Sequence, residues 1–340
     1  MEKGKISVII PVRNGVKWLE ECVNSILAQS YENYEVLILD DHSTDGTTQL
    51  AEKLAEKDSR VRLTQQNKNG VSNARNQGID ETDGAYITFV DADDKIDGKM
   101  FEKLHQYLEK ENSDIVLCDF YKWNGNETEK SGNSVNASKK REKTCNSENE
   151  GYSLKTVNKK KYIAEYLLRG NTRCWSILYR REVIGKVRFR EDLTIGEDMM
   201  FLVDLLQNLK KISVTDYKGY YYRINQSGVM LRPFTPSYMD EIKAWRLAFH
   251  IISWSYPQQK ARLASILAVS AMLVAGKLSR LSEKERLPYR KYVEECRLTV
   301  KKALQVPGAK SELPAGYGIK TALFCAWPEG YLKLYHRWKG

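Results

Sequence analysis

Residues 5–41 read KISVIIPVRNGVKWLEECVNSILAQSYENYEVLILDD, and this stretch decides the fold of the chain. It opens with the apolar run Ile6–Val12 and closes with a second run, Val36–Asp40, each typical of a buried strand. Between them, apolar residues recur at the spacing of a helix face. A strand, a helix and a second strand form the repeating unit of a parallel sheet.

The same alternation continues along the chain, and we therefore predict an α/β fold, with a Rossmann-like, mostly parallel sheet flanked by helices. In such a sheet the ligand crevice lies beyond the carboxyl ends of the strands, so the loops that follow the strands are the places to look for a site. The further predicted strands are Val61–Gln65, Ala85–Val90 and Ile115–Cys118, and the further predicted helices begin near Thr44, Gly70 and Asp97.

A polar segment interrupts the alternation. Residues 123–161 are rich in Asn, Ser, Lys and Glu and have few periodic apolar residues, so we expect a variable surface excursion there. Helical patterns dominate the last third of the chain. We predict a first domain at 1–230, divided by this excursion into the halves 1–122 and 162–230, followed by a basic helical region at 231–340.

The composition fits a cytoplasmic globular protein. A chain of 340 residues with 42% apolar content can bury a sizeable core. Its six cysteines form no CxxC pair, which favours reduced thiols. The first apolar run is too short for a signal peptide, and the longest, Leu263–Gly276, is shorter than the about 20 residues that span a membrane. We expect the longest run to form a buried helix.

Three carboxylates follow the predicted strand that ends at Val90. Asp91, Asp93 and Asp94 occupy four positions, and like charges this close repel unless a cation or solvent relieves them. Mg²⁺ or Mn²⁺, held by one or two carboxylates together with substrate phosphates, would do so. The alternative is a polar turn in which Asp94 caps the next helix.

Two more loops at the same edge of the sheet carry candidate ligands. Asp41 could accept the imide hydrogen of a uracil base, although capping of a helix by Ser43 or Thr44 also explains the DDHSTDGT loop. Arg75, one turn into the helix that begins near Gly70, could bind a diphosphate through its planar fork. An ordinary surface arginine is the alternative.

A transfer to a hydroxyl acceptor needs a carboxylate base. Glu197 and Asp198 precede an apolar helix, and we take Asp198 as the candidate base and Glu197 as its reserve. Capping of that helix alone would also explain the pair.

Together these segments resemble the family-2 inverting glycosyltransferases of the GT-A fold. The likeness rests on the motifs ISVIIPVRN, DDHSTDGT, NGVSNARNQGI, TFVDADD, CWSILYRREV, IGEDMMF and YYYRINQSGVM, in family order between residues 5 and 230. The resemblance implies a glycosyltransferase domain at 1–230, with a nucleotide-binding half at 1–122 and an acceptor half at 162–230. A nucleotide-sugar donor, with UDP as the preferred nucleotide, would transfer its hexose to the acceptor in one inverting displacement. The implied acceptor is a glycan or lipid-linked oligosaccharide used in surface polysaccharide synthesis.

The resemblance also implies roles for single residues. Around the base and diphosphate it places Pro11, Val12, Asn14, Asp41 and Arg75. Asp91 would meet the ribose or metal, Ala92 would contact the nucleotide sugar, and Asp93 would be the chief metal ligand. Trp175 would line the sugar and acceptor pocket, Asp198 would be the base, and Arg223 would lie near the phosphates.

Three positions depart from the family pattern. The acidic residue often found after the first strand is replaced in NGVKWL, His42 stands where glycine is usual, and Ile177 stands where lysine is frequent. None of these is one of the carboxylates assigned to the reaction.

The C-terminal region is basic. Residues 277–340 hold fourteen Lys and Arg against six Glu, and the end of the chain, AWPEGYLKLYHRWKG, mixes basic with aromatic residues. This mixture suits the anionic inner face of the cell membrane, while a solvated helix face is the alternative.

Three other functions fit parts of the sequence. A catalytically inactive sugar-binding subunit of a glycan synthase would keep the same motifs. Nucleic-acid binding is suggested by the net charge of +10 and the cluster Lys139–Arg141, but acidic loops at the ligand edge argue against it. A nucleotidyltransferase would need a glycine-rich basic loop after the first strand, and VRNGVKWLEE is not one.

Overall fold

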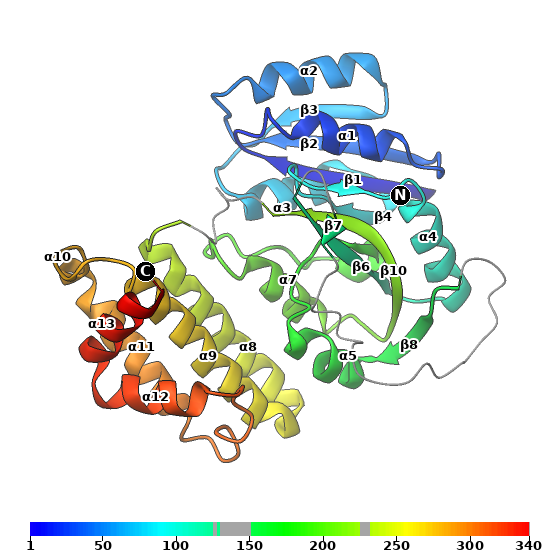
Figure 1. The fold of residues 1–340 in the computed structure, drawn as a ribbon. Helices are drawn as coiled ribbons and strands as arrows, with labels where there is room; N and C mark the ends of the chain where they lie inside the picture. The colour runs from blue at the N-terminus through cyan, green and yellow to red at the C-terminus, as the bar shows by residue number, and fades with distance from the viewer. Residues whose placement is uncertain (125–127, 130–150, 225–231, 340) are drawn as a thin grey trace. The chain divides into compact units, whose positions relative to one another are not determined.

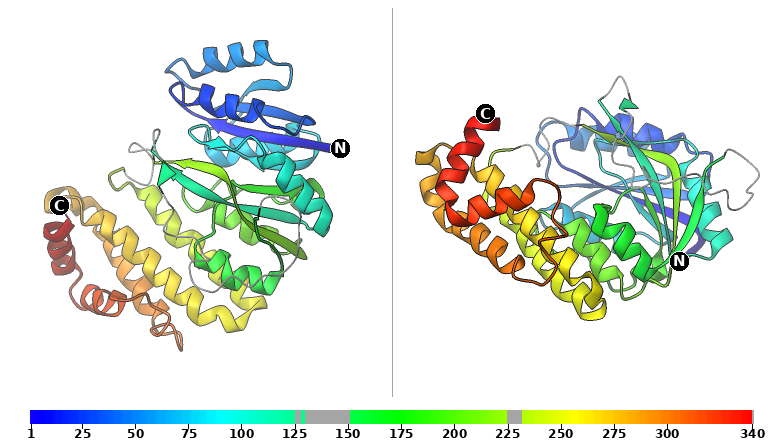
Figure 2. Two further views of the ribbon diagram at one scale, coloured as in Figure 1. Left: turned by 45° about the vertical axis from the view of Figure 1, so that its right-hand side comes forward. Right: turned by 60° about the horizontal axis from the view of Figure 1, so that its bottom comes forward.

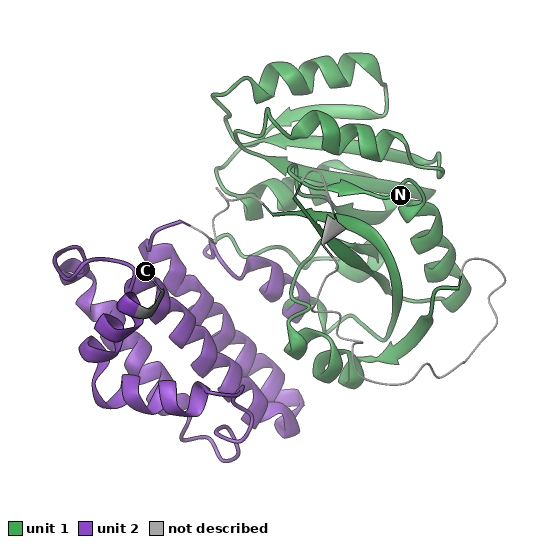
Figure 3. Cartoon of the chain, viewed as in Figure 1, with its two compact units in different colours: residues 1–191, 204–226 green, residues 192–203, 227–340 purple. Residues whose placement is uncertain are grey.

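The computed structural model of the protein describes residues 1–124, 128–129, 151–224 and 232–339 (Figure 1). The basic cluster Lys139–Arg141, much of the predicted surface excursion and the predicted domain border at residue 230 lie outside the described residues. The chain divides into two compact units (Figure 3). Unit 1 holds residues 1–191 and 204–226, and unit 2 holds residues 192–203 and 227–340.

Unit 1 is built on one ten-stranded sheet, whose main path runs in the order β3-β2-β1-β4-β9-β6-β10-β5, with β7 beside β6 and β8 beside β10. The strands are β1 (Glu2–Val12), β2 (Tyr34–Asp40), β3 (Val61–Gln65), β4 (Gly84–Phe89), β5 (Lys95–Ile96), β6 (Ile115–Trp123), β7 (Thr128–Glu129), β8 (Leu154–Asn158), β9 (Ile177–Arg180) and β10 (Lys211–Arg223). All five apolar runs predicted as strands are therefore strands.

The sheet is parallel in its first half and mixed in its second. Strands β1, β2, β3 and β4 pair in parallel, with Val12 opposite Asp40 at the carboxyl edge. Strand β9 then joins β4 and β6 in antiparallel direction, and β10 is parallel to β6 but antiparallel to β5 and β8. The expectation of a mostly parallel sheet missed these short antiparallel strands, because two to five residues carry too little periodicity to detect.

Helices cover both faces of this sheet (Figure 1). On one face, α1 (Leu19–Leu27), α2 (Thr47–Lys57) and α4 (Met100–Glu111) pack on the side chains of Ile6, Val8 and Ile10. On the other face, α3 (Val71–Glu81) approaches Ile9 so closely at Gly78 that an added Cβ would lie 2.5 Å from its Cγ2. Unit 1 also contains α5 (Lys159–Glu165), α6 (Arg181–Ile184) and the 3-10 turn Leu167–Arg169.

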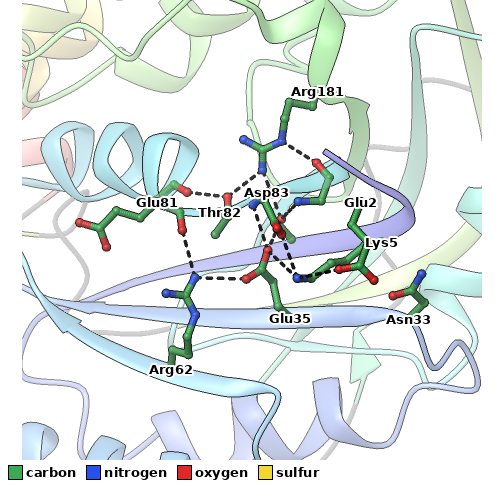
Figure 4. Close-up of polar contacts among 12 residues, drawn as sticks. Glu2, Lys5, Asn33, Glu35, Arg62, Glu81, Thr82, Asp83 and Arg181 are labelled. Atoms are coloured by element: carbon green, nitrogen blue, oxygen red, sulfur yellow. Dashed lines mark hydrogen bonds and ion pairs between the residues drawn. The ribbon is translucent and has the colours of Figure 1, made fainter.

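A polar network ties the strands together near the amino ends of β2 and β4 (Figure 4). Ser7 donates to Glu35 at 2.8 Å and accepts from the backbone N–H of Gly84 at 3.0 Å. The guanidinium of Arg181 reaches the same serine at 3.2 Å and Thr82 at 2.8 Å. These contacts occupy the amino ends of the strands, so the carboxyl ends, on the opposite side of the sheet, are the ones available for ligands.

Unit 2 is helical, and Figure 2 shows its long helices side by side. Its helices are the first part of α7 (Glu197–Leu205), α8 (Met239–Ser255), α9 (Lys260–Leu278), α10 (Glu283–Arg286), α11 (Arg290–Ala303), α12 (Tyr317–Ala326) and α13 (Pro328–Lys339), with 3-10 turns at Pro236–Tyr238, Pro257–Gln259 and Leu287–Tyr289.

Helix α9 contains the longest apolar run. Among the described residues, Pro257–Leu278 is the one helical stretch long and apolar enough to cross a membrane, judged by length and composition. Most of it is buried, and it packs against α8 and α11. The prediction of a buried helix at Leu263–Gly276 is confirmed.

The five described cysteines are all free thiols, as the sequence predicted for them. Cys145 lies outside the described residues.

Candidate active site

The acidic loop after β4 places its three carboxylates in different surroundings. Asp94 is 1% exposed, and its carboxylate accepts from the backbone N–H of Arg223 at 2.6 Å and from the hydroxyl of Tyr220 at 2.7 Å. Asp91 and Asp93 are half-buried. The suggestion that Asp94 caps the next helix is wrong, because α4 begins with Lys99 as its N-cap. Asp94 instead connects the loop to the distant strand β10.

The electrostatics of this loop fit a divalent cation. Burial raises the pKa of Asp94 well above its usual range, and the negative charges of Asp91 and Asp93 raise it further. Within the described part of the chain, no three His, Cys, Asp or Glu side chains group closely enough to hold a metal by themselves. A cation here would therefore take oxygens from Asp93 and Asp91 and complete its shell with substrate phosphates and water, as Mg²⁺ commonly does.

Arg75 lies beside the first of these carboxylates. Its Nη2 is 3.0 Å from Oδ1 of Asp91, and its guanidinium carbon is 5.2 Å from the ring centroid of Phe189. The side chain is 3% exposed, so it is not the surface arginine of the alternative interpretation. The structure thus joins two predicted site residues, while the binding of a diphosphate by Arg75 stays a prediction.

The loop after β2 is held by side chains from the end of β1. Asn14 donates its backbone N–H to Ser43 at 2.8 Å and accepts from the backbone N–H of Thr44 at 2.8 Å. Neither Ser43 nor Thr44 caps α2, whose N-cap is Gly46, so that alternative is wrong. His42, which stands where the family usually has glycine, has a φ of 51°, in the left-handed region that glycine favours.

Asp40 also holds this loop in place through hydrogen bonds. It is fully buried and accepts hydrogen bonds from Ser43, Thr48 and Gln65. Burial raises the pKa of this carboxyl, but the hydrogen bonds outweigh burial and leave the pKa below its usual value. Asp40 therefore stays ionised and acts as a fixed acceptor for the loop.

One carboxylate oxygen of Asp41 has no hydrogen-bond partner among the described residues. Its Oδ2 accepts from the backbone N–H of Gly70 at 3.2 Å and lies 3.3 Å from Nη1 of Arg13. Its Oδ1 is buried, and no donor among the described residues reaches it. A buried acceptor without a donor costs about 1–3 kcal/mol, so this position favours a ligand with an N–H group. Gln66, buried at the end of β3, likewise has a side-chain oxygen and nitrogen without a hydrogen-bond partner among the described residues.

Trp175 belongs to an aromatic stack that adjoins the carboxylates. Its ring lies 4.4 Å from that of Tyr220 and 5.3 Å from that of Tyr222, both nearly parallel to it. Tyr220 is also the donor to Asp94, and burial together with that carboxylate raises its pKa well above the usual value, so it stays protonated. The aromatic stack and the acidic loop are therefore connected through Tyr220.

Arg223, at the end of β10, is clamped beside Asp93. Its Nε donates to the backbone oxygen of Asp93 at 2.6 Å, and its Nη2 pairs with Glu21 at 2.6 Å. Its guanidinium carbon lies 4.2 Å from the ring centroid of Trp18 and 3.9 Å from that of Trp123. The resemblance placed Arg223 near the phosphates, and the structure places it against the acidic loop.

The remaining predicted residues fall as follows. Pro11 and Val12 end β1, with the backbone oxygen of Val12 accepting from Asp41 N–H at 2.8 Å, and Ala92 is buried between the half-buried Asp91 and Asp93. Ile177 is fully buried in β9. Glu197 and Asp198 lie in the first turn of α7, within unit 2, and their role as base stays a prediction.

Comparison with known proteins places this site in a family. The sequence model described as glycosyl transferase family 2 matches residues 7–188. The chain belongs to glycosyl transferase family 2. The matched residues include the whole acidic loop and the loop that carries Asp41.

Bacterial members of the family are among its relatives. The chain is 32% identical over 238 residues to the uncharacterized glycosyltransferase EpsJ of Bacillus subtilis, a match that covers 69% of this chain and 65% of EpsJ. It is 28% identical over 227 residues to the cholesterol galactosyltransferase of Borreliella burgdorferi, covering 65% of this chain and 60% of that protein. The matches thus span less than two thirds of the length of these relatives.

Solved structures of another protein show the same fold. Crystal structures of S. aureus TarS 1–349 in complex with UDP and with UDP-GlcNAc match this structure with TM-scores of 0.65 and 0.68. Each match covers 98% of this chain, and 89% and 90% of the respective TarS chains, at 20% sequence identity. The predicted fold, GT-A with helices after the catalytic sheet, is confirmed.

Sequence reasoning missed several residues of this family-2 site. Glu21, Trp18 and Trp123 hold Arg223 in place beside the acidic loop. Trp18 and Glu21 lie at the start of α1, where their helical spacing marks only a face of the helix. No signal in the sequence connects them with a residue two hundred positions later.

Proposed function

We propose that the protein is an inverting glycosyltransferase that moves a sugar from a UDP-sugar to a hydroxyl of a glycan or lipid-linked oligosaccharide. The observation that carries this proposal is the buried Oδ1 of Asp41, an acceptor without a donor at the carboxyl edge of the sheet. Uracil presents an N–H at the matching position of its ring, whereas cytosine presents an acceptor there. The base reaches this oxygen once the 60% exposed side chain of Arg13 turns away.

Two further observations support a nucleotide-sugar donor. The repulsion among Asp91, Asp93 and Asp94 suits a site that receives a divalent cation together with a diphosphate. The crystal structures of TarS with UDP and with UDP-GlcNAc, which share the fold, hold ligands of this class.

In the proposed reaction, Asp198 takes the proton of the acceptor hydroxyl as that hydroxyl attacks the anomeric carbon. Glu197 is the second candidate for this base. A divalent cation bound at Asp93 and Asp91 would neutralise the charge that develops on the departing diphosphate. Asp94 and Arg223 keep the acidic loop in its position, so that little reorganisation is needed during the reaction. The displacement occurs in one step, and the anomeric configuration inverts.

The proposal is tested by donor hydrolysis, which needs no knowledge of the acceptor. Purified protein is incubated with a panel of nucleotide sugars, with Mn²⁺, with Mg²⁺ or with EDTA, and release of the nucleotide is measured. We expect metal-dependent release of UDP from one sugar, and a loss on the order of 10²-fold or more in Asp93→Asn. Full activity of Asp93→Asn would contradict the metal assignment.

The variant Asp198→Asn helps to distinguish an active enzyme from a catalytically inactive sugar-binding subunit. We expect this variant to bind UDP as wild type does but to transfer no sugar once an acceptor is supplied, because the base has lost its charge. A wild-type protein that binds UDP yet releases none from any donor would instead indicate a catalytically inactive subunit.

We also propose that unit 2 binds the anionic inner face of the cell membrane. Helices α12 and α13 form an apolar hollow of about 390 Å³ edged by basic side chains. Ile319 is 79% exposed and Leu334 is 50% exposed, so apolar surface faces outward there. An apolar surface with Lys and Arg at its rim complements anionic lipid headgroups over acyl chains. The hollow is lined by Ile319, Lys320, Leu323, Tyr331, Leu334, Tyr335 and Arg337.

Liposome flotation tests this surface. We expect the protein to float with vesicles that contain phosphatidylglycerol and not with vesicles of phosphatidylcholine alone. Ile319→Glu should reduce flotation, whereas Trp254→Glu, at a 90% exposed residue of α8 outside the hollow, should not. Equal flotation of wild type and Ile319→Glu would refute the proposal.

A further inference from the structure

A second hollow lies in unit 1, apart from the carboxylates and from Asp41. It measures about 780 Å³ and is formed by β6, β10, the start of α4 and the residues before β8. We call it the tyrosine cleft. Its lining comprises Asp97, Lys99, Lys103, Asp119, Tyr121, Gly151, Tyr152, Asp216, Tyr217, Lys218 and Tyr221.

Aromatic rings supply the apolar surface of the cleft. Tyr121 and Tyr221 are direct neighbours across β6 and β10, and their rings stack at 5.4 Å with 25° between the planes. Tyr152 and Tyr217 form a second pair at 5.1 Å, edge to face. Tyr121 and Tyr221 are half-buried and Tyr152 is 37% exposed, so parts of these rings are available to a ligand.

The cleft also contains equal numbers of positively and negatively charged side chains. Lys218 lies 4.7 Å from the ring centroid of Tyr121, and Lys103 lies 5.0 Å from that of Tyr152. The cleft contains three lysines and three aspartates. Among the aspartates, Asp97 accepts from the hydroxyl of Tyr217, and Asp216 accepts from a backbone N–H at 2.7 Å. A ligand of either charge would therefore meet as many like charges as opposite ones.

The chemistry that fits such a cleft is that of a neutral sugar. The C–H faces of a pyranose ring are apolar and pack on aromatic rings, while its hydroxyls donate to carboxylates and accept from ammonium groups. Tyrosine pairs with interspersed donors and acceptors offer both kinds of contact. We propose that the tyrosine cleft binds a neutral oligosaccharide, a part of the acceptor glycan remote from the hydroxyl that is glycosylated.

A row of cations and rings connects the cleft with the acidic loop. Lys95 lies 5.3 Å from the ring centroid of Tyr221 and 3.6 Å from that of Trp123. Trp123 in turn packs on Arg223, which donates to the backbone of Asp93. An acceptor chain held in the cleft would thus lie along the strands that carry the site. This connection rests on the proposed function, but the binding of sugar in the cleft does not require it.

Calorimetry on the full-length protein without donor tests the cleft. The probes are neutral tetrasaccharides, cellotetraose and N-acetylchitotetraose, and the acidic tetragalacturonate. We expect at least one neutral probe to bind at millimolar concentration and the acidic probe to bind more weakly. Tyr121→Ala should weaken binding about tenfold by removing one stacking ring, and Tyr121→Phe, which keeps the ring, should bind as wild type does.

Unit 2 provides a matched control. Tyr289 and Tyr292 also stack, at 6.2 Å, and Lys291 lies 4.8 Å from the ring of Tyr292. Tyr292→Ala removes an equivalent stacked tyrosine and should leave oligosaccharide binding unchanged. Absence of binding by both neutral probes, preference for the acidic probe, or wild-type affinity in Tyr121→Ala would each overturn the proposal.

Donor hydrolysis distinguishes this inference from the proposed function. Tyr121 stacks on Tyr221 and lies beside Lys218, not in the acidic loop, so Tyr121→Ala should release UDP from the donor at the wild-type rate. Loss of oligosaccharide binding with intact UDP release supports the tyrosine cleft, whereas failure of UDP release in the wild type affects the proposed function alone.

Discussion

Asp94→Ala should unfold the protein more readily and also impair catalysis, because this buried carboxylate connects the acidic loop to β10. It accepts two hydrogen bonds, from the backbone N–H of Arg223 at 2.6 Å and from the hydroxyl of Tyr220 at 2.7 Å. Alanine accepts neither, and water has little access to a residue that is 1% exposed. Both donors would therefore be buried without a partner.

The expected magnitude follows from these two contacts. A buried donor without an acceptor costs about 1–3 kcal/mol, so Asp94→Ala should lower the free energy of unfolding by about 2–6 kcal/mol. In Asp94→Asn, the amide oxygen can still accept from Arg223, and the amide nitrogen can donate to the oxygen of Tyr220. We expect that variant to lose less than about 1.5 kcal/mol.

Urea unfolding followed by tryptophan fluorescence measures the stabilities, and UDP release measures the activities. The predicted order of stability is wild type, then Asp94→Asn, then Asp94→Ala, with donor turnover impaired in the alanine variant because the acidic loop loses two of its hydrogen bonds to β10. An Asp94→Ala protein with wild-type stability and turnover would refute this interpretation of the loop.

Three further predictions concern stability. Glu241 is half-buried, and Trp245 Nε1 donates to it at 2.9 Å. Desolvation raises the pKa of Glu241, so the stability it contributes is fully present below the pKa of the unfolded state and is lost as pH rises through the pKa of the folded state. Glu241→Gln should therefore match wild type near pH 4 and melt about 2–4 °C higher at pH 8 for a gain of about 1 kcal/mol, as measured by calorimetry. Gly84→Ala would put a Cβ 2.6 Å from the backbone oxygen of Lys5 and should cost about 1–3 kcal/mol in urea unfolding. His42→Gly should be tolerated, whereas a β-branched valine in the same left-handed conformation should cost about 1–3 kcal/mol, visible as a lower melting temperature.

Much of the fold could be predicted from local pattern alone. The five apolar runs are strands because each is bounded by polar or turn residues and flanked by helical periodicity, and β3 has the predicted bounds, Val61–Gln65. The short strands β5, β7, β8 and β9 were not predicted, because β5, β7 and β9 have only two to four residues and β8 lies in the polar segment 123–161. They form only because longer neighbours present open edges to them.

The site was less accessible to prediction, because its contacts span the chain. Local reasoning offered a helix cap as the alternative role of Asp94, but its partners Tyr220 and Arg223 are 126 and 129 residues away. Arg75 was placed by helical spacing on the ligand side, yet spacing alone does not reveal its ion pair with Asp91. Asp41 was selected from the sequence as a candidate acceptor, and the structure adds that one of its oxygens has no donor among the described residues.

The most direct test of the uridine donor is calorimetric titration of UDP and CDP in the presence of Mn²⁺. If Oδ1 of Asp41 receives the N–H of uracil, the wild type should bind UDP about 10- to 100-fold more tightly than CDP, since cytosine would place a second acceptor against a buried one. Asp41→Asn, whose amide can donate to cytosine, should lose or reverse this preference. Equal affinity of the wild type for UDP and CDP would contradict the account.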